Sequence, residues 1–281
     1  MTHTIDNGTL KITVDDHGAE LKSLVKGDTD FICSGTEFWK YSSPILFPIV
    51  GKLKDDTFRF GGKNYSLPSH GFGRLSDFVF VKDNPLTFRL TFGDDTLKNY
   101  PFKFALNVSY TLDANQLRVN WLVENLDDKT IYFSIGAHPA LSVPFDGGNF
   151  DDYQLEFDSD EHCARIPLAG GLLSDERIPT IDGKILKLNY DLFKGDALIF
   201  DNLKSSSVTI RRDKKSVTLK AEGFPFWGIW TKIGAPFLCI EPWHGHADFV
   251  NFAGDLTEKD CIVALEIGKT FTAGYSIIVD A

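Results

Sequence analysis

The chain has 281 residues, of which 43% are hydrophobic, and its formal net charge is −10. This length fits one large β-domain or two smaller domains, and the hydrophobic share is too high for a disordered chain. The acidic charge repels phosphate groups, so it argues against nucleic acid and anionic membranes as partners.

The first half of the chain contains short segments in which apolar and polar residues alternate, which is typical of β-strands. Two of these segments flank Gly61-Gly62, a dipeptide that favours the tight turn of a β-hairpin. Asp83-Asn84-Pro85 is a second turn signal. The strands predicted in this half are 10–14, 57–60, 63–67, 78–81, 86–92, 104–112 and 117–123.

The second half continues the strand pattern, and few segments anywhere have the 3.6-residue apolar repeat of a helix. Its predicted strands are 132–135, 153–157, 197–200, 208–211, 217–221, 227–231, 237–241 and 275–279. Residues 164–187 show no clear alternation and are predicted to be an irregular excursion over one sheet face. The sequence therefore predicts an all-β protein in which residues 1–281 form a single domain, a large two-layer antiparallel β-sandwich.

The N-terminal residues and the cysteines indicate the cellular compartment in which the protein resides. Residues 1–6 lack a basic segment followed by an apolar one, and no apolar run approaches the roughly 20 residues of a membrane span. The cysteines lie far apart without metal or disulfide spacing, which favours reduced thiols. They are Cys33, Cys163, Cys239 and Cys261. We expect a cytoplasmic protein, a monomer or a weak homodimer, without nucleic-acid or membrane partners.

The segment Leu-Pro-Ser-His-Gly-Phe-Gly-Arg at 67–74 combines groups suited to binding a ligand. His70 is a side chain of the type that titrates near neutral pH, and Arg74 is a permanent planar cation four residues away. Gly71 and Gly73 allow the backbone to approach a ligand closely. The alternative is an exposed turn with a hydrated histidine.

Two further segments place ionisable side chains at the ends of predicted strands. His138 follows the strand 132–135 and precedes Pro139, which cannot donate to a strand ladder. Glu241 ends the apolar strand 237–241, so we expect it to be partly buried, where a carboxylate needs a partner. The structural alternatives are a core-edge histidine bound to a carbonyl and a carboxylate that caps the next loop.

Large aromatic residues near Glu241 are candidate stacking surfaces for the C–H groups of a ligand, although most such residues belong to cores. We favour Trp243, which lies two residues after Glu241. The other candidates are Trp39, Trp227, Trp230 and Phe226.

His244, His246 and Asp248 have the alternating spacing of metal ligands on one face of a strand. Gly245 interrupts the strand pattern, and no supporting set of outer ligands is visible. We therefore predict no metal site. The pairs Asp15-Asp16 and Asp55-Asp56 are predicted to be solvated turn charges.

Five segments resemble, in the same order, the aldose 1-epimerase (mutarotase) superfamily, especially its LacX-type proteins and hexose-6-phosphate mutarotases. Each motif is weak alone, whereas five in order are fairly specific. They are Phe-Pro-Ile-Val-Gly-Lys at 47–52, Ser-His-Gly-Phe-Gly-Arg at 69–74, Gly-Ala-His-Pro at 136–139, Asp-Ala-Leu-Ile-Phe at 196–200 and Glu-Pro-Trp-His-Gly at 241–245.

The resemblance implies a large antiparallel β-sandwich and an isomerase that interconverts the anomers of a hexose or hexose phosphate without metal or organic cofactor. Carried over by position, it makes Glu241 the general base, His138 the general acid and His70 a support for the reacting ring. The implied substrate-binding residues are Lys52, Arg74, Asp196 and Trp243.

Lys52 departs from the family pattern, which usually has arginine there. Lysine is a point charge without bidentate recognition, so the departure weakens the prediction of a 6-phosphate substrate. Two other classes remain open from the sequence: a sugar-binding or sensing module without turnover, and an enzyme that acts elsewhere on the ring or cleaves glycosidic bonds. Hydrolysis needs two carboxyls that flank the bond, for which Glu241 and Asp196 are the candidates.

Overall fold

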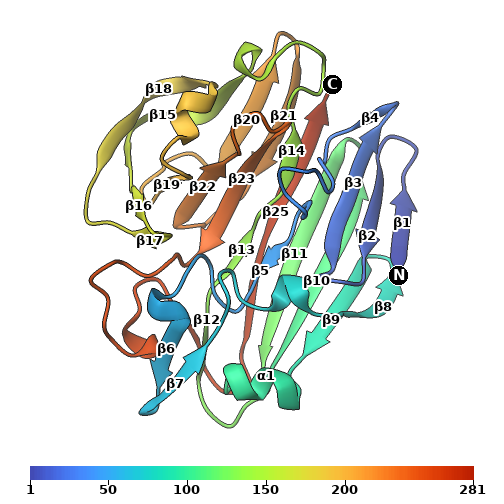
Figure 1. The fold of residues 1–281 in the computed structure, drawn as a ribbon. Coiled ribbons are helices and arrows are strands. Elements are labelled where there is room, and N and C mark those ends of the chain that lie inside the picture. The colour runs from blue at the N-terminus through green and yellow to red at the C-terminus, as the bar shows by residue number, and fades with distance from the viewer.

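The computed structural model describes residues 1–281, and most of them lie in strands or in the loops between strands (Figure 1). The strands of the first half are β1 (Thr2–Asp6), β2 (Lys11–Asp15), β3 (Glu20–Lys26), β4 (Thr29–Asp30), β5 (Ile45–Leu46), β6 (Thr57–Phe60), β7 (Lys63–Ser66), β8 (Val79–Asp83), β9 (Leu86–Thr91), β10 (Phe104–Asp113), β11 (Gln116–Asn125), β12 (Ile131–Phe133), β13 (Ile135–Ala137) and β14 (Ala140–Ser142). Those of the second half are β15 (Gln154–Arg165), β16 (Leu168–Ala169), β17 (Leu172–Leu173), β18 (Ile178–Lys187), β19 (Leu198–Phe200), β20 (Ser207–Arg212), β21 (Lys215–Lys220), β22 (Phe226–Trp230), β23 (Phe237–His244), β24 (Val263–Leu265) and β25 (Thr270–Asp280).

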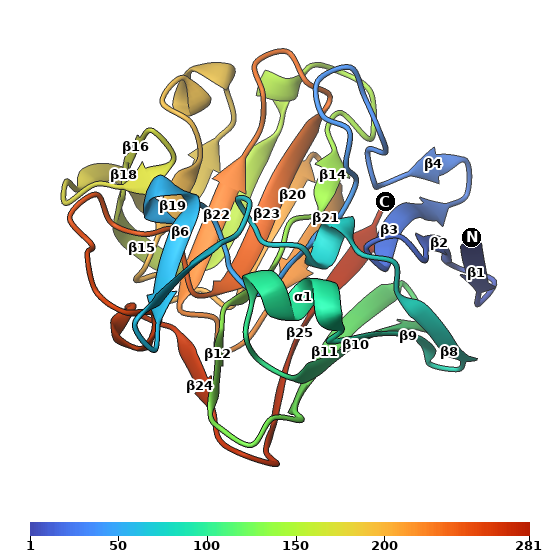
Figure 2. The same cartoon turned by 60° about the horizontal axis from the view of Figure 1, so that its bottom comes forward.

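Helical structure is limited to one short α-helix and five 3₁₀ turns. The α-helix, α1 (Asp94–Asn99), joins β9 to β10 at one end of the large sheet (Figure 2). The 3₁₀ turns are η1 (Lys54–Asp56), η2 (Gly73–Leu75), η3 (Phe150–Asp152), η4 (Tyr190–Phe193) and η5 (Leu256–Glu258). None of these helices has the length and apolar character needed to span a bilayer.

Two large antiparallel sheets make up the architecture. One has nine strands in the order β18-β15-β20-β21-β25-β11-β10-β9-β8, and the other has the order β19-β22-β23-β13-β5, with β14 paired to β23. Side chains from both sheets meet in one cluster of 59 buried hydrophobic residues, so the sheets pack face to face. The prediction of an all-β antiparallel sandwich is confirmed.

Strand β23 is the element that positions the site. Side chains of a strand alternate between its two faces. Leu238 and Ile240 join the large core cluster, whereas Cys239, Glu241 and Trp243 lie on the opposite face. Seven of the eight residues of β23 are buried, because both faces of this strand are covered.

The prediction of an irregular excursion over 164–187 is wrong. Residues 178–187 form β18, which pairs with β15 as the edge of the nine-stranded sheet. Most side chains of β18 are exposed, so its sequence lacks the buried alternation by which strands are recognised. Backbone hydrogen bonds to β15 hold this segment as a strand, and such bonds leave no trace in the pattern of side chains.

Strand β23 also runs three residues further than predicted, through Pro242 to His244. Proline interrupts a strand because it lacks an amide donor. Here the ladder between β23 and β13 ends at the pair formed by Gly136 and Trp243, and it resumes with β14 at the pair formed by Ala140 and Cys239. Pro242 therefore lies where the ladder on this side is interrupted, while on the other side β22 pairs with β23 from Cys239 to Trp243, which makes Glu241 an interior strand residue.

Candidate active site

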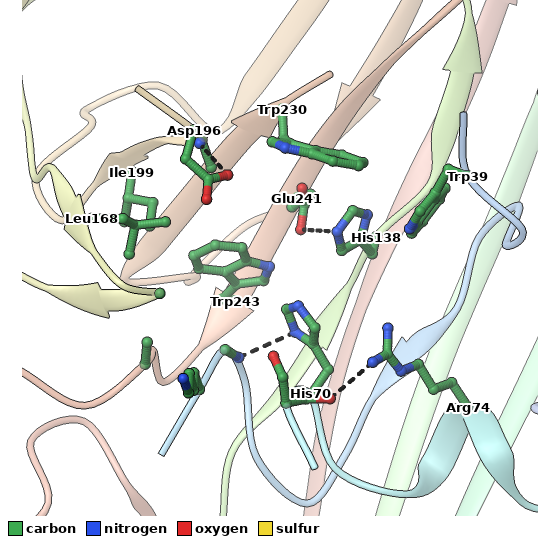
Figure 3. A pocket seen from close by; sticks show the side chains of 16 residues that line it. Trp39, His70, Arg74, His138, Leu168, Asp196, Ile199, Trp230, Glu241 and Trp243 are labelled. Atoms are coloured by element: carbon green, nitrogen blue, oxygen red, sulfur yellow. Dashed lines mark hydrogen bonds and ion pairs between the residues drawn. The ribbon is translucent and has the colours of Figure 1, made fainter. Parts of the chain in front are cut away.

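A pocket of about 250 Å³ opens on the face of the six-stranded sheet that carries Glu241 and Trp243 (Figure 3). It brings together all seven residues that the sequence singled out, from five separate segments of the chain. Its lining includes Lys52, His70, Arg74, His138, Asp196, Glu241 and Trp243, together with Trp39 and Trp230. A concave site with convergent polar groups among aromatic walls is typical of small-ligand binding.

The register of the strands places His138 opposite Glu241. Gly136 pairs with Trp243 and Ala140 with Cys239, so the antiparallel register carried across the gap between β13 and β14 sets His138 opposite Glu241. The His138 Nε2 atom lies 3.2 Å from Glu241 Oε2 (Figure 3). Pro139, between β13 and β14, and Pro242, in β23, have no amide donors to leave unpaired in this gap.

Burial acts on both members of this pair. Glu241 is 1% exposed and His138 is 7% exposed. Burial raises the pKa of Glu241 well above its usual range, and the charge of Asp196 adds to that rise. Burial lowers the pKa of His138 well below its usual range, with His70 and Arg74 acting in the same direction. Burial therefore favours the neutral form of both side chains.

Buried polar atoms of the pair remain free to contact a ligand. His138 Nδ1 and the indole Nε1 of Trp243 make no hydrogen bond within the protein, and the one protein contact of Glu241 Oε2 is the ion pair with His138 at 3.2 Å. Buried polar atoms are nearly always hydrogen-bonded, so two unpartnered atoms beside this ion pair indicate a binding site for a polar molecule.

His70 is held by backbone contacts between its loop and the segment before η1. Its amide donates to the carbonyl of Gly51 at 2.8 Å, and its carbonyl accepts from the amide of Phe47 at 3.2 Å. The amide of Gly51 donates to Nδ1 of the ring at 3.1 Å. Nδ1 therefore carries no hydrogen, and in the neutral ring Nε2 is a hydrogen-bond donor. His70 lines the pocket as a donor of fixed tautomer.

The charge state of His70 makes the unfolding free energy depend on pH. Burial, assisted by the charge of Arg74, lowers the pKa of His70 from 6.5 to about 3. The folded ring thus stays neutral where the unfolded ring takes up a proton, so stability that is present above pH 6.5 is lost as the pH falls. We expect His70 alone to account for about 2 kcal/mol of loss between pH 6.5 and about pH 5.

His70→Asn tests this expectation, because asparagine keeps an acceptor for Gly51 and tolerates the φ of 65° at this position. Urea unfolding at the two pH values should show a smaller loss in the variant than in the wild type. His162→Asn, at an exposed histidine outside the pocket, should keep the full loss. Equal losses in all three proteins would show that His70 is not held neutral.

Three tryptophans form the aromatic walls. Trp39 stacks on the ring of His138, with centroids 4.7 Å apart, and Trp230 meets the same ring edge-on at 5.6 Å. Trp243 lies flat over the strands beside it, because a Cβ at Gly136 or Gly228 would come within 2.6 Å or 2.5 Å of its indole. These two glycines are site residues that the sequence analysis missed.

The sequence offered Trp39 and Trp230 as candidate stacking residues but gave no reason to prefer them to Trp227 or Phe226. Trp39 comes from the loop before β5 and Trp230 from the end of β22, so nothing in the local sequence connects them with His138. The remaining candidates, Trp227 and Phe226, do not line the pocket. Both are buried, and Trp227 belongs to the large core cluster.

Arg74 and Asp196 lie on opposite sides of the pocket (Figure 3). The guanidinium of Arg74 lies over the ring of Tyr41 at 4.7 Å and donates to the carbonyl of Ser69 at 2.9 Å, while its buried Nε makes no hydrogen bond. Asp196 has a φ of 79° and accepts from the amide of Ala197 just before β19. Lys52 is half-buried, with Nζ 3.4 Å from the carbonyl of Gly170.

The spaced set His244, His246 and Asp248 does not converge. His244 packs against Phe224, whereas the Nδ1 of His246 contacts the carbonyl of Ala247. Asp248 forms an ion pair with Lys259 at 2.5 Å. These contacts take the three side chains to different surroundings.

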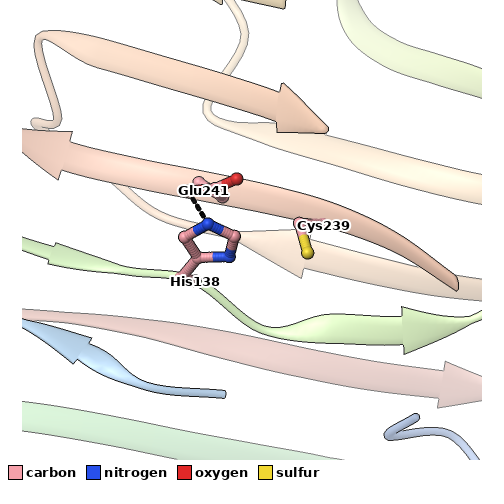
Figure 4. A group of neighbouring side chains, drawn as sticks. All are labelled: His138, Cys239 and Glu241. Atoms are coloured by element: carbon pink, nitrogen blue, oxygen red, sulfur yellow. Dashed lines mark ion pairs between the residues drawn. The ribbon is translucent and has the colours of Figure 1, made fainter. Parts of the chain in front are cut away.

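A different trio, His138, Cys239 and Glu241, has potential metal-ligand atoms within 4.8 Å of one another (Figure 4). Burial, assisted by Glu241, raises the pKa of the Cys239 thiol well above its usual range. Cys239 packs with Ala140 and Phe237, which favours a packing role beside His138 and Glu241. All four cysteines are free thiols.

Comparison with known proteins places this geometry in a family. The aldose 1-epimerase family model matches residues 1–263. Protein LacX (chromosomal) of Lactococcus lactis subsp. lactis is 32% identical over 99% of both chains. The galactose mutarotase related enzyme of Lactobacillus acidophilus has 37% identity and a TM-score of 0.94, covering 100% of this chain and 98% of that one.

A galactose mutarotase-like protein of Lactobacillus casei ATCC 334 has 31% identity and a TM-score of 0.92, covering 99% of this chain and 100% of that chain. The similarity to LacX confirms the LacX-type resemblance that the five motifs predicted. The chain belongs to the aldose 1-epimerase family, and it is an isomerase of the sugar epimerase and mutarotase class.

Proposed function

We propose that the protein interconverts the α and β anomers of a hexose by opening and closing its ring, with Glu241 as general base and His138 as general acid. The observation that carries this proposal is the buried pair itself. Its two side chains lie 3.2 Å apart in a pocket, and the buried Nδ1 of His138 and Nε1 of Trp243 beside them make no hydrogen bond within the protein.

The reaction needs two proton transfers on one small ligand. Glu241 takes the proton of the C1 hydroxyl, the bond from C1 to the ring oxygen breaks as C1 becomes a carbonyl, and protonated His138 gives its proton to the ring oxygen. Rotation about the C1–C2 bond presents the other face of the carbonyl. The reverse transfers close the ring and return both groups to their starting states.

The pair carries one proton throughout this cycle. The proton is on His138 before the ring opens, and Glu241 holds one afterwards. Burial disfavours the charged form of both side chains, as the directions of their pKa shifts indicate. In the free pocket burial therefore favours the neutral pair, with the proton on Glu241, so this proton has to pass to His138, 3.2 Å away, before the ring opens.

The remaining lining residues suit binding and orientation. His70 Nε2 is a neutral donor for a sugar oxygen, and the exposed Asp196 carboxylate is an acceptor for hydroxyls. The flat indole of Trp243 forms an apolar surface for ring C–H groups, with Nε1 as a free donor. Holding the ring between these groups keeps the base and the acid in reach of their atoms.

Exchange NMR of anomeric protons tests the proposal directly. We expect added protein to accelerate exchange between the α and β signals of at least one sugar among glucose, galactose and their 6-phosphates. The control is the same protein after heat denaturation. If no sugar of a broad panel exchanges faster than in buffer, the proposed activity is wrong.

We further propose that Arg74 and Lys52 select an anionic sugar such as a hexose phosphate. Both cations line the pocket, and the buried Nε of Arg74 has no partner in the protein. A phosphate group binds well to a planar guanidinium, whereas a neutral sugar gains much less from it.

Arg74→Ala should therefore raise the KM for a phosphosugar by about 10-fold to 100-fold, and that for the free sugar only a few-fold, because a charge-assisted contact contributes about 1.5–3 kcal/mol. Steady-state kinetics with both substrates checks this, with Arg74→Lys retaining charge and Arg118→Ala as an exposed control outside the pocket. Equal losses for the two substrates would contradict phosphate selection.

A further inference from the structure

A second cluster of potential ligand side chains lies outside the pocket lining. It joins His246, in the loop after β23, to Asp260 and Cys261, in the turn between η5 and β24. One ligand atom from each lies within 4.8 Å of the other two. None of the three lines the sugar pocket, so the proposed catalysis does not account for them.

His246 presents a bare nitrogen to this cluster. Its Nδ1 lies 2.6 Å from the carbonyl oxygen of Ala247, which can only accept, so Nδ1 carries the hydrogen. In the neutral ring, Nε2 therefore keeps its lone pair, and this buried atom makes no hydrogen bond. The side chain is only 1% exposed, and its Nε2 faces Asp260 Oδ2 at 3.5 Å. Contacts with Phe226 and Phe249 hold the ring in place.

The charges around the cluster permit a cation. Lys259 is the neighbouring cation, and its Nζ forms a buried ion pair with Asp248 Oδ1 at 2.5 Å. Its charge is thus balanced within the protein. The Cys261 sulfur lies 3.7 Å from Asp260 Oδ1, so a carboxylate and a thiol adjoin the imidazole nitrogen. Imidazole, thiolate and carboxylate together are a donor set that zinc accepts and that calcium and magnesium do not favour.

We propose that His246, Asp260 and Cys261 form a binding site for a zinc-class divalent cation. On binding, the Cys261 thiol releases its proton to solvent and becomes a thiolate, while His246 binds as the neutral ring and Asp260 as the carboxylate. Water takes the fourth position of a tetrahedral ion. The ion ties the turn before β24 to the loop after β23, next to Ala247 in the pocket wall.

This proposal departs from the sequence-based prediction of no metal site. That prediction considered His244, His246 and Asp248, of which only His246 takes part here. The other two ligands follow it in the chain by 14 and 15 residues, and no spacing rule connects them with a histidine after a strand. The fold of the intervening loop brings them together.

Cobalt(II) serves as the spectroscopic probe for this site. The full-length protein is freed of metal by chelator dialysis and titrated with Co²⁺. We expect a thiolate-to-cobalt charge-transfer band in the near ultraviolet that saturates at one equivalent and disappears when Zn²⁺ is added. Cys261→Ser should lose the band, because only thiolate gives it, whereas Cys33→Ser, at a cysteine remote in sequence, should keep it.

His246→Asn should weaken cobalt binding at least tenfold, and Zn²⁺ should raise the Tm of the wild type but not that of Cys261→Ser, because ligands stabilise the state that binds them. Absence of the band at saturating Co²⁺, or its persistence in Cys261→Ser, would overturn the proposal. Cys261 is exposed, so its serine variant is expected to fold, and unfolding midpoints without metal check this. These readouts do not depend on mutarotase activity.

Discussion

Replacing Glu241 by glutamine is expected to lower kcat for anomer exchange by about 100-fold to 10,000-fold, the usual contribution of a general base. Glutamine keeps the size of the side chain and its buried surroundings but cannot take the proton of the C1 hydroxyl. Sugar affinity should change by less than about tenfold, since the aromatic walls and His70 remain. Exchange NMR gives the rate, and calorimetric titration gives the affinity.

Glu161→Gln is the matched control, because Glu161 is also a fully buried carboxylate but lies outside the pocket. It accepts from the amide and hydroxyl of Ser205, so its variant should lose stability and keep kcat. A Glu241→Gln protein with an unchanged rate would refute the role of Glu241 as base. If the wild type binds sugar but does not accelerate anomer exchange, the protein is instead a sugar-binding module.

Replacing Gly71 by alanine is expected to lower the free energy of unfolding by about 3 kcal/mol and to impair activity. Gly71 has a φ of 69°, which costs an L-residue about 1–2 kcal/mol. A Cβ there would also lie 2.3 Å from the carbonyl oxygen of Phe47, so the backbone must shift. Such a shift displaces the neighbouring His70 from the amide of Gly51 that orients its ring.

Gly62→Ala separates the cost of the positive φ from the cost of the steric contact with Phe47. Gly62 has a φ of 77°, but a Cβ there would meet nothing within 4 Å. Its variant should lose only about 1–2 kcal/mol and keep full activity. Urea unfolding of both variants beside the wild type measures the difference, and equal losses would show that the contact with Phe47 does not constrain the loop.

Short motifs in the sequence were sufficient to predict much of this protein. Alternating apolar residues predicted strands such as β11, in which every second residue is buried and the residues between are half-buried or exposed. The motifs around His70, His138 and Glu241 predicted the family and the residues that line the pocket. These features are local, because they depend on residue type and short spacing.

The edge strand β18 shows where local patterns fail. Its residues are mostly exposed, so no apolar alternation records its pairing with β15. The end of β23 shows the same limit, since the sequence predicted a strand that ends at Glu241, and the strand continues because β22 pairs with it as far as Trp243.

The sequence by itself determined the family, the all-β class and the side chains that line the pocket, because each depends on residue identity within short segments. Only the tertiary structure decided how those side chains are arranged. The register of β23 against β13 and β14 sets Glu241 opposite His138, and the amide of Gly51 assigns the tautomer of His70. Burial then shifts the pKa of each group toward its neutral form, because low dielectric surroundings penalise ions, and burial is a property of the packed fold rather than of any one segment.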